Sequence, residues 1–141
     1  LGGAFSFYYT FHPIRTTLAA RVGAATNLGD FEFFQANTLG GQTNLRGHRN
    51  FRFSGKSSVY QNTELRIKLT KINNYILSSS IGILAHADHG RVWQPGEISD
   101  TWHYGYGGGV WFSLFDVIIL QGVYTWSDED PLFTFRGGFL F

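Results

Sequence analysis

The chain has 141 residues, a formal net charge of +1, and neither Cys nor Met. This length predicts one domain, the missing Cys excludes disulfides and thiol chemistry, and the near-neutral charge gives no argument for a nucleic-acid partner. No apolar run reaches the roughly 18 residues that a membrane helix needs. The absence of Met, at position 1 as well, predicts that the chain is a segment of a longer protein.

Seven segments show apolar residues at every second position, a period that predicts strands rather than helices. In chain order they are 4–12, 17–24, 58–69, 75–88, 103–114, 120–127 and 132–141. Pro13-Ile14, Asn73-Asn74 and Asp116 predict short turns between strands. Longer connections alternate with these turns, so short turns are expected at one end of the sheet and long loops at the other.

The last segment has one aromatic face and one polar or small face. The rings belong to Phe133, Phe135, Phe139 and Phe141, and the opposite face carries Thr134, Arg136 and Gly138. Because successive side chains of a strand point to opposite faces, the rings all point one way. An aromatic face that runs to the final residue suits a strand whose outer solvent is lipid.

A soluble antiparallel sandwich would alternate in the same way. It would, however, enclose charged residues such as Arg21, Glu64 and Arg66 and expose rows of Phe and Leu to water. A transmembrane β-barrel with lipid outside and a polar interior removes both conflicts, and about 9–11 residues per strand suffice to cross a bilayer. Bacterial barrels normally have an even number of strands, so residues 1–141 are predicted to be the C-terminal strands of one larger barrel domain.

A long loop at about residues 28–57 interrupts the pattern, and a loop of this length is usually functional. It contains Leu45-Arg46-Gly47-His48, while Glu64 and Asp88 lie on the polar face of the next two strands. A guanidinium fits carboxylates in a bidentate way, and Gly47 lets the backbone turn or approach the wall. The residues alone leave two alternatives open: either Arg46 latches an inward-folded loop to Glu64 and Asp88, or the three residues are unrelated solvated charges.

These motifs resemble those of the outer-membrane insertase superfamily, which includes BamA, TamA and the two-partner secretion transporters. The loop motif of that family ends in an aromatic residue where this chain has His48. Its acidic strand residue matches Glu64, its Phe/Ala-x-Asp-x-Gly pattern matches Ala87-Asp88-His89-Gly90, and its terminal Phe matches Phe141. The resemblance implies a 16-stranded parent barrel in the bacterial outer membrane, of which this chain would form the last seven strands. With it, we predict that Arg46 latches the loop to Glu64 and Asp88 instead of being an unrelated solvated charge.

The resemblance also implies a function in protein insertion or polypeptide transport through a barrel with a labile seam. Gly137, Gly138, Phe139 and Phe141 would belong to that seam and to the assembly signal. The expected partners are outer-membrane lipid and lipopolysaccharide, client polypeptides, the remaining strands and periplasmic accessory proteins, without nucleic acid. Two alternatives stay open: a passive anchor or exporter for an N-terminal phosphoesterase-like or patatin-like domain, and a simple diffusion pore.

Other chemistry is not predicted. His86 and Asp88 share a face, but His89 points the other way in a regular strand, so a metal site is not expected. The run Asp128-Glu129-Asp130 is interpreted as a solvated acidic turn. We find no nucleophile with interpretable partners, and we expect no enzymatic activity and no cofactor. The glycines Gly105, Gly107 and Gly109 are expected to make room for the loop or to allow bending.

Overall fold

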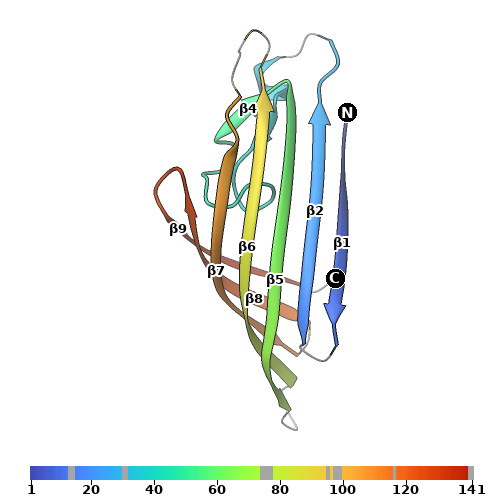
Figure 1. Cartoon of the computed structure of the whole chain (residues 1–141), viewed down its shortest axis with the longest axis vertical. Coiled ribbons are helices and arrows are strands. Elements are labelled where there is room, and N and C mark those ends of the chain that lie inside the picture. The colour runs from blue at the N-terminus through green and yellow to red at the C-terminus, as the bar shows by residue number, and fades with distance from the viewer. Residues whose placement is uncertain are drawn as a thin grey trace.

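The structure, a computed structural model, describes residues 1–12, 15–29, 32–73, 78–94, 96, 100–115 and 117–139. These residues form an all-β protein with one seven-stranded antiparallel sheet and one two-stranded sheet (Figure 1). The strands of the large sheet are β1 (Gly2–Phe11), β2 (Thr16–Thr26), β5 (Ser57–Asn73), β6 (Ser78–Trp93), β7 (His103–Leu114), β8 (Ile118–Ser127) and β9 (Leu132–Phe139).

The sheet is a meander in which each strand pairs with the next of the large sheet along the chain, in the order β1-β2-β5-β6-β7-β8-β9. All seven predicted strands are therefore confirmed. β5 and β6 have 17 and 16 residues, so the expected length of about 9–11 residues is wrong for this pair. The register between them shifts at Lys68/Thr70, and such a bulge bends the strand and increases its local twist.

The loop expected at 28–57 has structure of its own, which corrects the prediction of an irregular stretch. It contains a 3-10 turn, η1 (Phe33–Gln35), and a hairpin of β3 (Asn37–Leu39) and β4 (Phe53–Gly55). Ser57 already belongs to β5. Three-residue strands give too little alternation to be recognised as a period-2 pattern, so the hairpin could not be predicted in this way.

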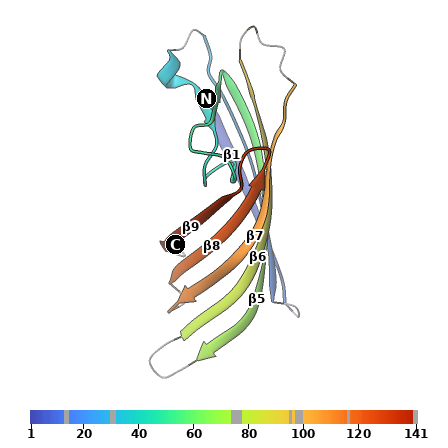
Figure 2. The same ribbon diagram turned by 90° about the vertical axis from the view of Figure 1, so that its left-hand side faces the viewer.

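The sheet is strongly curved, with the 40–52 segment on its concave side (Figure 2). Tyr8 of β1 and Gly138 of β9 line the same cavity although they lie on opposite edge strands. β1 and β9 do not pair with each other in the described part of the chain, so the sheet is open there.

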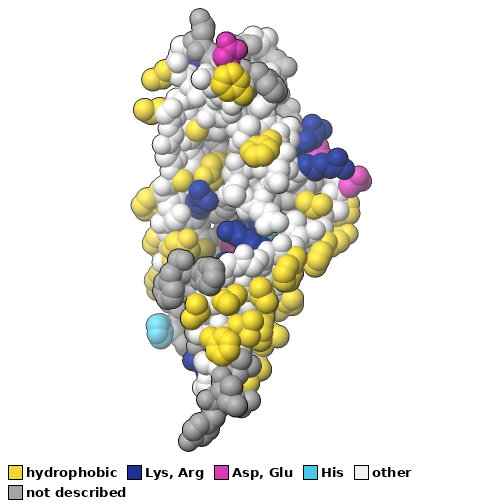
Figure 3. All heavy atoms as spheres, turned by 180° about the vertical axis from the view of Figure 1, so that it is seen from behind, with side chains coloured by type: hydrophobic (Ala, Val, Ile, Leu, Met, Phe, Trp, Pro, Cys, Tyr) yellow, Lys and Arg dark blue, Asp and Glu magenta, His cyan; other side chains and the backbone are white. Residues whose placement is uncertain are grey.

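The two faces of the sheet have opposite polarity. The convex face carries rings and aliphatic side chains that remain exposed, and Phe133 and Phe135 are each 65% exposed. In Figure 3, hydrophobic side chains gather over β8 and β9, while basic side chains lie in the hollow at the centre of the molecule. Buried apolar residues among those described are few: Leu39, Leu45, Leu84 and Val123.

Several predicted features fall outside the described residues. They are Pro13, Ile14, Asn74, Asp116 and the terminal Phe141, and of Phe139 only the backbone is described. Among the described residues, no helix has the length and apolar character needed to cross a membrane.

Candidate functional site

The 40–52 segment returns to the concave face through several tight backbone turns. Gly40, Gly41 and Gly47 have φ values of 118°, 93° and 91°, a region that side chains other than hydrogen rarely tolerate. At Gly40, an added Cβ would also collide with the carbonyl oxygen of Arg49. The conformations of these glycines thus determine the path of the loop independently of its charged contacts.

Asn44 and two leucines hold this path in place. The Asn44 side chain accepts a hydrogen bond from the Gly40 amide at 3.0 Å and donates one to the Thr38 carbonyl at 2.9 Å. Leu39 and Leu45 are completely buried. Asn62 of β5 then donates to the Asn44 carbonyl at 2.9 Å, which attaches the loop to the large sheet one residue before Leu45.

Arg46 lies between Glu64 of β5 and Asp88 of β6. Its Nε and Nη2 donate to the two carboxylate oxygens of Asp88 at 2.6 and 2.7 Å, and its Nη1 donates to Glu64 Oε2. Its backbone amide also donates to Asp88 Oδ2 at 3.1 Å. We call these three residues the Arg46 latch. The guanidinium binds the Asp88 carboxylate in a bidentate way through Nε and Nη2, and its Nη1 binds the Glu64 carboxylate.

The latch is enclosed and shared with a second arginine. The side chain of Asp88 is fully buried, and that of Glu64 is 11% exposed. Burial alone would lower the pKa of Arg46, but hydrogen bonding and charge from Asp88, then from Glu64, outweigh it and raise that pKa. The second oxygen of Glu64, Oε1, accepts from Arg66 Nε at 2.5 Å, so two arginines face two carboxylates.

Gly47 and Gly105 allow the loop to touch β7 and β8. The Gly47 carbonyl accepts a hydrogen bond from Ser127 Oγ at 2.9 Å, and a Cβ at Gly47 would lie 2.8 Å from Thr125 Cγ2. A Cβ at Gly105 would collide with the Arg46 carbonyl oxygen. Gly105 therefore makes room for the loop, as expected from the sequence.

His48 occupies the position where the resembling family has an aromatic residue, and its side chain is fully buried. Its Nε2 lies 3.1 Å from the Tyr104 carbonyl oxygen and 3.3 Å from Asp128 Oδ1. Phe53 packs edge-on against the imidazole, with 5.1 Å between the ring centres. His48 thus keeps the packing of a ring and adds polar contacts to β7 and to the turn after β8.

The acidic turn at 128–130 is not simply solvated, which corrects the prediction. Glu129 Oε1 accepts from Arg52 Nε at 2.5 Å, and Asp128 Oδ2 lies 3.5 Å from His103 Nδ1. Arg21 of β2 adds a further contact by donating to the Thr43 carbonyl at 3.3 Å. The loop therefore contacts β2, β5, β6, β7, β8 and the β8–β9 turn.

These additional partners could not be read from the sequence. Thr125 and Ser127 are ordinary strand residues without charge, and Arg52 and Glu129 are separated by most of the sheet. Thr125 and Ser127 point to the concave face because side chains alternate along a strand. This alternation does not show which atoms of the loop they contact.

The predicted seam glycines lie in β9 within a regular ladder. Gly137 pairs with Leu120 and Gly138 with Ile119, so no kink interrupts this strand. A Cβ at Gly138 would meet nothing within 4 Å, and one at Gly137 would lie 3.2 Å from Leu120 Cδ2. Gly137 and Gly138 therefore reduce side-chain packing in this part of β9 while the strand pairing stays regular.

The histidines near Asp88 do not converge. His86 Nε2 lies 3.0 Å from Thr125 Oγ1 on the concave side, whereas His89 packs against Trp102 with ring centres 5.8 Å apart. Among the described residues, no group of three or more His, Asp or Glu could hold a metal ion.

No protein-family model matches the chain, and no curated protein matches it either.

Proposed function

We propose that this chain is the C-terminal part of an outer-membrane β-barrel, with 16 strands in the complete barrel, that inserts or translocates other polypeptides. The observation that carries the proposal is the inverted polarity of the sheet together with a buried, charge-held loop on its concave side. Neither feature is expected for a soluble sandwich, in which two apolar faces pack together and charges stay outside.

The convex face suits contact with lipid. Exposed aliphatic and Phe side chains cover it, and rings gather toward the long-loop end, where Tyr106 stacks on Trp126 at 6.3 Å between ring centres. Arg91 lies 4.8 Å from the ring centre of Trp93 in the same region. Tyr and Trp beside basic residues at one level are typical of a membrane–water interface.

The open edges of the sheet suit strand exchange with a client. β1 and β9 each present an unpaired backbone edge within the described chain, and such an edge can template an added strand. In the complete barrel, the remaining strands would pair with β1 and approach β9, which would leave β9 at the seam. Gly137 and Gly138 would make that seam weaker than a junction of β-branched residues.

Client insertion into liposomes tests this function. The reconstituted protein should accelerate the folding of an outer-membrane client, and Gly138→Thr should slow that acceleration severalfold. Thr finds free space at this position and favours the strand, which stabilises pairing by about 0.5–1 kcal/mol. Gly3→Thr in β1 is the matched control, because a Cβ at Gly3 also meets nothing within 4 Å.

The outcomes separate the rival functions. A diffusion pore or a passive anchor would conduct ions or display cargo without accelerating client folding, and either result would remove the insertase proposal. If both glycine variants act alike, client insertion does not pass through β9.

A further inference from the structure

Two adjoining cavities form a basic groove along the concave face. The first, of about 540 Å³, is lined by the loop and by β1, β2, β5, β8 and β9; the second, of about 770 Å³, lies toward the short-turn end. They share Arg66 and Ile119. We define the basic groove by the cationic residues that line it: Arg15, Arg21, Arg46, Arg66, Lys68, Lys71 and Arg136.

The charge of the groove is strongly unbalanced. It takes seven of the chain's 11 Lys and Arg residues, whereas Glu64 is the only carboxylate among the described residues that line it. Glu64 is already engaged by Arg46 and Arg66. Lys68 and Arg136 form no ion pair with a carboxylate within the described part of the chain, so their charges face the cavities unneutralised.

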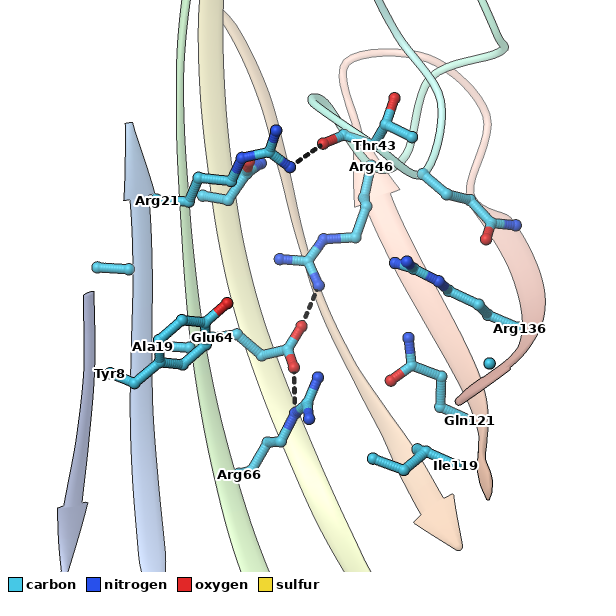
Figure 4. Close-up of a pocket in the computed structure, with 14 residues that line it drawn as sticks. Tyr8, Ala19, Arg21, Thr43, Arg46, Glu64, Arg66, Ile119, Gln121 and Arg136 are labelled. Carbon is cyan, nitrogen blue, oxygen red and sulfur yellow. Dashed lines mark hydrogen bonds and ion pairs between the residues drawn. The ribbon is translucent and has the colours of Figure 1, made fainter. Parts of the chain in front are cut away.

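Cations from several strands point into the same space (Figure 4). Arg46 enters from the loop, Arg66 from β5, and Arg136 from β9 on the opposite side. A confined space with one sign of charge concentrates counter-ions because its walls focus the electric field. Cations that line the same cavities repel one another, and an anionic ligand relieves that repulsion.

We propose that the basic groove binds acidic segments of a polypeptide in extended conformation. Arg66 and Lys68 are two residues apart on one face of β5, so their Cα atoms are separated by about 6.5–7 Å. An extended peptide with carboxylates at alternate positions has the same spacing. Guanidinium groups bind such carboxylates with paired hydrogen bonds, and Arg66 keeps both Nη groups for this purpose while its Nε holds Glu64.

The lining favours a peptide over a polynucleotide. Single-stranded nucleic acids are bound by rows of aromatic side chains on which the bases stack, but the rings that line the groove among the described residues are only Tyr8, Trp111 and the imidazole of His12. Tyr60 also lies on the concave side, where Arg21 is 5.4 Å from its ring centre, but it lines neither cavity. Apart from Ile119, the remaining lining consists of amide, hydroxyl and small side chains, which can pair with a peptide backbone.

The loop gives the groove a direction. Gln42, Thr43 and Arg46 form the wall at the latch end, whereas His12 and Arg15 line the other cavity beside the short turns. A peptide that enters from the short-turn end therefore meets Arg15 and Lys68 before it reaches Arg66. Because Arg66 also holds Glu64, the ligand shares a residue with the Arg46 latch.

This inference deepens the proposed function, since it names the class of polypeptide that such a barrel would accept. Its test is direct binding of a fluorescent 12-residue peptide of alternating Glu and Ser to the protein in non-ionic detergent, followed by anisotropy. The Glu-Ser peptide should bind at low salt, and a Gln-Ser peptide should not. Affinity should fall as salt screens the charges.

Two variants place the binding in the groove. Lys68→Gln combined with Arg136→Gln should weaken binding of the Glu-Ser peptide about tenfold, as expected for the loss of two partly solvated charge contacts. Lys56→Gln, which removes a charge outside both cavities, should leave the affinity within about twofold. Equal effects of the double variant and of Lys56→Gln would overturn the assignment of the site.

Further outcomes separate this inference from the proposed function. An oligothymidylate or inorganic phosphate that binds more tightly than the Glu-Ser peptide would overturn the peptide assignment. Peptide binding without any acceleration of client folding would support the groove and reject the insertase. Client folding at the normal rate with no peptide binding would reject the groove alone.

Discussion

Two sets of cations on the concave face differ in how their charges are matched. At the latch end, Arg46 and Arg66 are matched by Glu64 and Asp88 within hydrogen-bond distance. Lys68 and Arg136 line the cavities without a carboxylate partner among the described residues, Lys68 toward the short turns and Arg136 in the cavity that Arg46 also lines. Matched charges can hold a loop, whereas unmatched charges are available to a ligand, so we propose that the same residue types serve structure in one set and recognition in the other.

Removal of Asp88 should cause the largest loss of unfolding free energy, because Asp88 is the main partner of Arg46 in the Arg46 latch. Asp88 accepts three hydrogen bonds from Arg46 and is fully buried. Asp88→Ala leaves a guanidinium short of its main partner, at a cost of about 3–5 kcal/mol in unfolding free energy. Urea unfolding in detergent, followed by Trp fluorescence, measures it.

Asp100→Ala is the matched control for this prediction. Asp100 also accepts from an arginine, Arg91, at 2.6 Å, but its side chain is 89% exposed. Exposed pairs contribute about 0–1 kcal/mol. Equal losses for the two variants would mean that enclosure adds nothing and that the latch is an ordinary surface pair.

The geometry of the guanidinium, rather than its charge, is the next feature to test. Arg46→Lys keeps a cation between Glu64 and Asp88 but cannot reproduce the bidentate contact with Asp88. We expect a loss of about 2 kcal/mol for Arg46→Lys, since one or two charge-assisted hydrogen bonds disappear. Arg46→Ala should cost more, because two carboxylates then face Arg66 alone. If neither variant lowers stability or client insertion, the latch is wrong.

The close approach of the loop to β7 can be tested without changing any charge. Gly105→Ala places a methyl group against the Arg46 carbonyl oxygen, so the loop must withdraw. Such overpacking costs about 1–3 kcal/mol. Gly108→Ala on the same strand is the control, because a Cβ there meets only the Leu84 carbonyl oxygen, at 3.2 Å. Gly108→Ala should change the unfolding free energy by less than half as much, and the reverse order would contradict the observed loop position.

The residue pattern was sufficient for the strands, whereas the choice of the latch over three unrelated solvated charges also rested on the family resemblance. Neither of them predicted the environment around the latch residues. Strand parity places Glu64 and Asp88 on one face because side chains alternate with period 2, and neighbouring strands bring them close. The β3–β4 hairpin, the contact of Arg52 with Glu129 and the shared role of Arg66 all depend on the path of the loop. That path is determined by three glycines with positive φ, whose dihedral angles cannot be read from the residue type alone.

The smallest expected effect concerns the two unmatched cations. Lys68→Gln combined with Arg136→Gln removes two cations that have no carboxylate partner in the described residues, so no ion pair is lost and mutual repulsion in the groove decreases. We expect the unfolding free energy to change by no more than about 0.5 kcal/mol per substitution, and toward higher stability at low salt. The same urea unfolding experiment at two salt concentrations measures this. A loss as large as that of Asp88→Ala would show that these cations support the fold, and the contrast between matched and unmatched cations would then disappear.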